Sequence, residues 1–256
     1  MAARPCRFKS CAPHQVLITM SFILQRAVRN WYLHDVSFSA VLIESFVDGV
    51  EKQAAESIVE YEQKQQTFEV VDDGLEEYAY LRTVHQGLDD TSYNLELIFH
   101  EYFPSLQRSS ALITLCSYFE HELDKLCLLY QSEKAFRLGL SDLKGKAIDR
   151  SAAYLEKVVG LNVCRTSQEW IEIKNIQMVR NALVHNGRRV RAEDERAFVQ
   201  FANKVNSLSR DDAAEIVVGS GFLSYVVQTY GRYFKLLHDS ILEKENISSV
   251  DGAGGL

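Results

Sequence analysis

The chain has 256 residues, of which 46% are apolar and 25% are charged, and its formal net charge is −7. This apolar content is enough to form a buried core. The negative charge argues against a protein that coats nucleic acids non-specifically, because such proteins need a broad cationic surface, although a local basic site is compatible with it.

Helices are the main elements that the sequence predicts. Only three prolines and 13 glycines interrupt the chain, and apolar residues between them recur at helical spacing. The run Ile216-Val217-Val218, closed by Gly219-Ser220-Gly221, predicts one short β-hairpin near residues 214–220. We therefore expect an all-α fold with at most this small sheet.

The first 102 residues contain no motif that we can name. Residues 1–19 are expected to be a flexible tail, and residues 20–102 a helical extension. Within the extension we predict an amphipathic helix over 37–66, with Val41, Leu42 and Phe46 on its apolar face, and helices over 75–86 and 91–102. This extension is a natural place for partner contacts or substrate selection.

A long helix is predicted over residues 107–131, after the break at Pro104. Its apolar row includes Cys116, Glu120 and Cys127. A carboxylate in such a row needs a cation, and Arg180 is the best available partner. The neighbouring His121, Glu122 and Asp124 point in different directions on this helix, so they predict a solvated face rather than a metal site.

The cysteines and the hydropathy pattern predict the compartment. The chain has five cysteines, and Cys116 and Cys127 share one predicted helix, which fits free thiols in a reducing cytosol. The apolar run 16–24 is too short to span a bilayer and lacks a typical cleavage site. We expect a cytoplasmic protein with no membrane contact.

The most informative stretch is residues 178–187, at the end of a predicted helix that Thr166 or Ser167 can cap and Gly187 can terminate. At about 100° per residue, a narrow polar stripe forms on this helix and Arg180 lies to one side of it. The stripe consists of Lys174, Gln177, Asn181 and His185.

The pattern Arg180-Asn181-x-x-x-His185, following the helix that contains Ser117-Tyr118-Phe119-Glu120, resembles the HEPN superfamily (higher eukaryotes and prokaryotes nucleotide-binding) over roughly residues 103–243. We accordingly expect a HEPN-like domain over residues 103–245. The resemblance implies a compact helical bundle that forms a homodimer with two motifs facing each other. It also implies a metal-independent endoribonuclease of toxin–antitoxin or antiphage-defence systems, with a possible antitoxin or defence partner. Residues 246–256 would be a second flexible tail.

The family motif implies that Arg180 and His185 are catalytic, with Asn181 and Glu120 orienting them. The chemistry is consistent with this. Attack of a 2′-hydroxyl on the adjacent phosphate needs proton transfer, which imidazole performs near neutral pH, and a cation, which guanidinium supplies as a planar fork. No metal or other cofactor is expected. RNA would be held by a set of polar and cationic side chains, namely Lys174, Gln177, Arg188, Arg189 and Arg191.

Other interpretations remain open at this level. Arg180 could be only the structural partner of Glu120, and His185 could interact only with the last carbonyls of its helix. The three arginines after the motif could form an ordinary solvated loop. A non-catalytic module for dimerisation or for nucleotide or RNA binding is therefore the alternative to the enzyme.

Overall fold

A computed structural model describes residues 28–72 and 78–251 of the chain. These residues are mostly helical and include two small antiparallel sheets. The predicted fold class is therefore confirmed. The tail expected at residues 1–19 lies outside the described residues.

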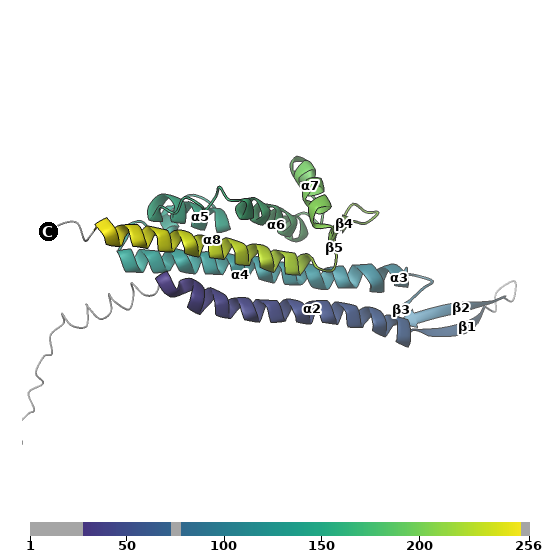
Figure 1. The fold of residues 1–256 in the computed structure, drawn as a ribbon. Coiled ribbons are helices and arrows are strands. Elements are labelled where there is room, and N and C mark those ends of the chain that lie inside the picture. Colours follow the sequence, from purple (N-terminus) through teal and green to yellow (C-terminus); the bar gives the residue numbers. More distant parts are fainter. Residues whose placement is uncertain (1–27, 73–77, 252–256) are drawn as a thin grey trace, which may run out of the picture.

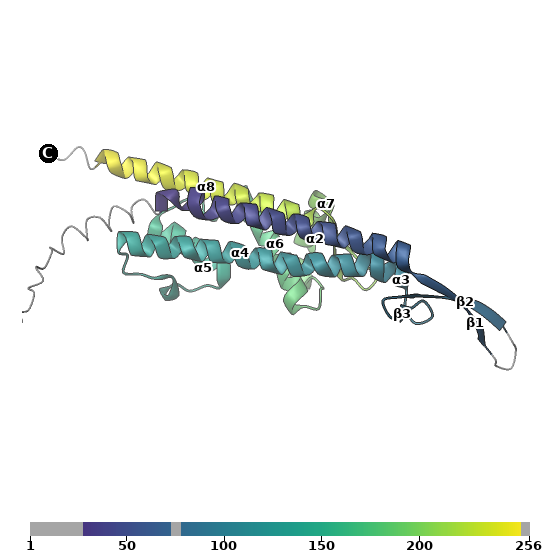
Figure 2. The same cartoon turned by 90° about the horizontal axis from the view of Figure 1, so that it is seen from below.

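Three long helices form the body of the molecule: α2 (Ser37–Lys64), α4 (Phe103–Lys134) and α8 (Phe222–Asp251). They lie side by side along most of their length, and each contacts the other two (Figures 1 and 2). Aromatic rings fill the space between them, with the Phe119 and Tyr230 rings stacked 4.2 Å apart and the Trp31 and Phe234 rings in edge contact at 5.6 Å. This aromatic core makes one rod from segments far apart in the sequence.

The shorter helices cover the side of α4 and α8 that faces away from α2 (Figure 1). In chain order they are η3 (Leu140–Asp142), α5 (Ala147–Tyr154), η4 (Leu155–Val159), α6 (Gln168–His185), η5 (Ala192–Asp194) and α7 (Glu195–Val205). Helix α5 turns directly into the π-helical segment η4. Helix α6 carries the motif and packs on both α4 and α8.

The segment after α2 is a β-hairpin, and the helix predicted over 75–86 is wrong. Strand β1 (Gln66–Asp72) pairs antiparallel with β2 (Tyr78–His85), which pairs at its end with β3 (Leu88–Asp89). The sequence of both strands is rich in β-branched and aromatic residues, which favour a pleated ribbon. The hairpin extends beyond the ends of α2 and α4 (Figure 1).

No break separates the expected extension from the expected domain. Helix α3 (Leu95–Leu97), the π-helical η2 (Ile98–Tyr102) and α4 follow one another directly, so the boundary predicted at residue 103 lies inside helical structure. Pro104 does not end a helix, because it occupies the first turn of α4, where no amide hydrogen is needed. The main core includes Val28, Trp31 and Val47, so residues before 103 belong to the same bundle. At the other end α8 continues to Asp251, so the first residues of the tail predicted over 246–256 are helical.

Helix α2 buries a different face from the predicted one. Val47, Ala54 and Tyr61 are its buried residues, whereas Val41 and Leu42 are 65% and 56% exposed. The π-helical turn η1 (Tyr32–Val36) directly precedes α2. Periodicity identified the helix but not the face that its neighbours cover.

The second sheet confirms the predicted hairpin. Strand β4 (Leu208–Arg210) pairs antiparallel with β5 (Ile216–Val218), and the residues Leu208, Ile216 and Val218 are buried. This small sheet packs against α4, α6 and α7 close to the end of the motif helix.

Candidate functional site

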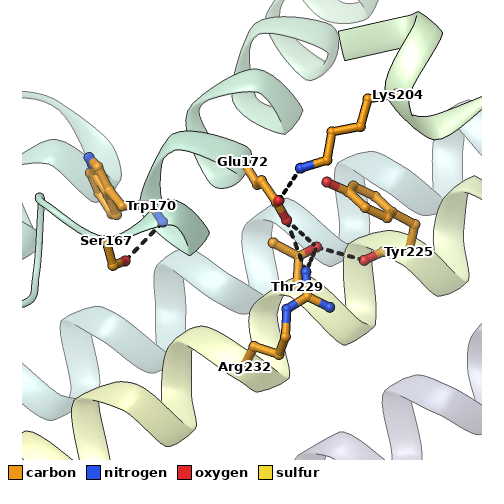
Figure 3. Close-up of polar contacts among 7 residues, drawn as sticks. All are labelled: Ser167, Trp170, Glu172, Lys204, Tyr225, Thr229 and Arg232. Atoms are coloured by element: carbon orange, nitrogen blue, oxygen red, sulfur yellow. Dashed lines mark hydrogen bonds and ion pairs between the residues drawn. The ribbon is translucent and has the colours of Figure 1, made fainter.

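Helix α6 begins and ends as its sequence predicts. Of the two candidate caps, Ser167 is the one used: its hydroxyl accepts a hydrogen bond from the Trp170 amide at 3.2 Å (Figure 3). The helix ends at His185, and Gly187 adopts a φ of +57°, a left-handed conformation that glycine reaches at little cost. The motif residues therefore lie in the last two turns of a well-defined helix.

A buried carboxylate anchors the middle of α6 to its neighbours. Glu172 is 7% exposed and interacts with Lys204 of α7 and with Arg232 of α8, the latter at 2.9 Å (Figure 3). Burial by itself raises the pKa of Glu172, but the hydrogen bond and charge of Lys204 and the charge of Arg232 outweigh it and hold that pKa below its ordinary value. These contacts connect α6 to α7 and α8.

The motif residues lie in one cleft of about 500 Å³ between α4, the start of α5, and α6. Polar and apolar side chains both line it: Cys116, Ser117, Phe119, Glu120, Lys146, Ala147, Ile148, Asp149, Ile173, Lys174, Gln177, Arg180, Asn181, His185, Arg191 and Tyr230. A cleft of this size is typical of sites for small molecules or single nucleotide units. We refer to it as the α4–α6 cleft.

Arg180, Asn181 and His185 are in direct contact at the rim of the α4–α6 cleft. The Nη1 atom of Arg180 donates to Asn181 Oδ1 at 3.1 Å and lies 3.4 Å from His185 Nε2. His185 is exposed, whereas Arg180 is half-buried. Guanidinium and imidazole are thus presented together to solvent, with no carboxylate within ion-pair distance of Arg180 among the described residues.

Glu120 lies in the same cleft but does not form the expected ion pair with Arg180, because no contact of 4.0 Å or less joins them. It is half-buried, so the cleft solvates it in part. Two residues further along α4, Glu122 is buried: it is 4% exposed and accepts a 3.5 Å hydrogen bond from Ser39. The prediction of a solvated face therefore fails at Glu122, because α2 covers it, while His121 is exposed.

Two predicted binding residues, Lys174 and Gln177, are in the cleft and interact with each other. Lys174 Nζ lies 2.7 Å from Asp149 Oδ2 and donates to Gln177 Oε1 at 2.5 Å. Asp149 was not predicted, and it is the ion-pair partner of Lys174. Lys174 therefore connects α6 to α5 as well as facing the cleft.

The three arginines after the motif separate in space. Arg188 is turned into the fold, where its Nη2 donates to Ser105 Oγ at 2.9 Å and to the Ile216 carbonyl at 2.7 Å, so its predicted role in holding RNA does not fit its position. Arg189 is 60% exposed, 3.8 Å from Glu215 and outside the α4–α6 cleft. Only Arg191 lines the cleft.

The base of the cleft contains a thiol–phenol contact. Cys116 Sγ and Tyr230 Oη are 3.3 Å apart, and burial raises the pKa of Cys116 to about 11. The thiol is therefore protonated at neutral pH and is a poor nucleophile. Cys116, Cys127 and Cys164 are free, as the sequence predicts for the first two, while Cys6 and Cys11 lie outside the described residues.

Lys146 is the cleft cation that sequence reasoning missed. It precedes α5, far from the motif in the chain, and no pattern in the sequence relates it to α6. Its position in the cleft results from the packing of α5 on α4.

No family model, curated protein or solved structure matches this chain. Among residues 28–72 and 78–251, no three side chains of His, Cys, Asp or Glu are grouped so that they could bind a metal ion. Within the same ranges, every helix is too short or too polar to cross a bilayer.

Proposed function

We propose that this protein is a metal-independent endoribonuclease that cleaves RNA by attack of a 2′-hydroxyl on the adjacent phosphate. The observation that carries the proposal is the contact of Arg180, Asn181 and His185 at the rim of an open polar cleft. A guanidinium without a carboxylate partner can bind a phosphate through two hydrogen bonds, and an exposed imidazole next to it can transfer a proton.

The charge of the cleft supports a polyanionic substrate. Although the whole chain carries −7, the cleft contains four lysine or arginine side chains and only two carboxylates. Arg180 would stabilise the charge that develops on the phosphate, and Asn181 would hold the guanidinium in place. Glu120, separate from Arg180, would be free to orient the ribose or a water molecule.

The proposal includes a homodimer, because cleavage needs both a general acid and a general base and each cleft has one histidine at its rim. Val184, next to His185, and Ile171 are apolar residues of α6 that are 40% and 51% exposed. A second copy packed on this helix would cover them and bring a second histidine near the first. A protein that is strictly monomeric by light scattering and cleaves RNA fully would contradict this part of the proposal.

The test is incubation of the purified protein with total RNA in excess chelator. We expect cleavage by the wild type, products ending in a 2′,3′-cyclic phosphate, and loss of cleavage in His185→Ala and Arg180→Ala. His121→Ala is the matched control, because His121 is exposed on α4 and does not line the cleft.

Fluorescence anisotropy with a labelled oligoribonucleotide separates the enzyme from a binding module. If the wild type binds RNA but leaves it intact, the protein is a non-catalytic RNA-binding protein and not an enzyme. A role as a toxin or defence effector predicts in addition that expression arrests growth, and that His185→Ala relieves the arrest.

A further inference from the structure

We infer that Lys146 forms a phosphate subsite of the α4–α6 cleft, which holds an RNA phosphate next to the one bound by Arg180. This inference rests on the proposed function, because it assigns a second phosphodiester of the same single-stranded RNA to a residue outside the motif.

The first support is the state of the cations in the cleft. Lys174 forms an ion pair with Asp149 at 2.7 Å, and Arg180 donates to Asn181 and lies beside His185. Lys146, in contrast to Lys174, is exposed and has no carboxylate within 4.0 Å among the described residues, and in the latter respect it resembles Arg180 and Arg191 on α6 and the loop after it. A lysine that lines a cleft without an internal partner is available to an anion from solution.

The second support is the position of Lys146 on another element. Arg180 and His185 come from the last turns of α6, whereas Lys146 comes from the loop that enters α5. Because all three line one cleft of about 500 Å³, a bound chain would contact them at different points along its backbone. Adjacent phosphates of a single strand need such separated cations, and one guanidinium cannot serve both.

The residues on both sides of Lys146 have positive φ angles. Ala147 has a φ of +47°, in the left-handed region that residues other than glycine rarely adopt. Gly145, on the other side, has a φ of +133°. Lys146 therefore enters α5 between two residues with unusual backbone conformations.

The test compares Lys146→Ala with Lys144→Ala. Lys144 is exposed, two residues away and outside the cleft, so both variants lose one charge from the same loop. The probe is a labelled, fully 2′-O-methylated RNA oligonucleotide, which has no free 2′-hydroxyl and therefore cannot be cleaved by the proposed reaction. Binding is followed by anisotropy at several salt concentrations, with thermal unfolding as the check that both variants are folded.

We expect Lys146→Ala to weaken binding several-fold and to lower the slope of log K against log salt by about 0.7, the value for one phosphate contact on a single strand. Lys144→Ala should change neither quantity. With cleavable RNA, Lys146→Ala should raise KM and leave kcat near the wild-type value, because a phosphate away from the scissile bond contributes to binding in the ground state and the transition state alike.

Substrate length provides an independent readout. A dinucleotide has one phosphodiester, so its affinity should be nearly the same for the two variants, whereas a tetranucleotide should distinguish them. Equal affinities and equal salt slopes for Lys146→Ala and Lys144→Ala, in a wild type that binds and cleaves RNA, would overturn the subsite and leave the enzyme intact. A wild type that neither binds nor cleaves RNA would remove both proposals together.

Discussion

The buried carboxylate of Glu172 offers the sharpest test of how the motif helix is held. Glu172→Gln keeps the size of the side chain and removes its charge, so the contacts with Lys204 and Arg232 lose their ionic character. Hydrogen bonds to charged groups contribute about 1.5–3 kcal/mol each when buried. Because the Lys204 and Arg232 side chains are 51% and 47% exposed, water replaces part of that interaction.

We therefore expect Glu172→Gln to lower the free energy of unfolding by roughly 1–3 kcal/mol, which for a chain of this size corresponds to a fall in Tm of about 2–10 °C. Urea unfolding followed by circular dichroism at pH 7 measures the change. Glu193→Gln is the matched control, since Glu193 is exposed and has no ion pair among the described residues.

The stabilisation by Glu172 should depend on pH. The pKa of Glu172 is lowered in the folded state, so its stabilisation is complete above the pKa of an unfolded glutamate, about 4.3, and is lost as pH falls through the folded value. The difference between the wild type and Glu172→Gln should therefore shrink below about pH 4. If Glu172→Gln is as stable as Glu193→Gln at pH 7, the proposed role of the Glu172 contacts is wrong. It is also wrong if the difference in the free energy of unfolding between the wild type and Glu172→Gln is unchanged in acid.

Two further predictions concern residues near the motif. Arg188→Ala should cost about 2–3 kcal/mol in urea unfolding, because it removes the donor to Ser105 and to the Ile216 carbonyl, whereas Arg189→Ala should cost less than about 0.5 kcal/mol; equal effects would contradict the structural role of Arg188. Cys116, with its pKa raised to about 11, should be alkylated roughly a hundredfold more slowly at pH 8 in the folded protein than in urea, as mass spectrometry of its peptide can measure. Fast labelling of the folded protein would show that the thiol is not buried against Tyr230.

The elements that the sequence determined are those whose signals are local. A capping residue at Thr166 or Ser167, the left-handed residue Gly187 and the helical spacing between them define α6, and the β-branched run at Ile216 defines its strand. The polar stripe that ends at His185 also follows from helical geometry alone, so the motif residues could be placed on one side of α6 before any tertiary contact was known.

Tertiary structure decided which of the remaining polar residues meet. Glu120 and Glu122 are two residues apart on one helix, yet α2 buries the second and the cleft receives the first, because rotation of α4 against its neighbours is set by packing over the whole bundle. The same holds for the hairpin after α2, since strands are stabilised by partners across the ribbon. Lys146 lines the cleft and Arg188 does not, because the positions of both depend on long-range packing. The periodicity of one segment carries no information about such packing.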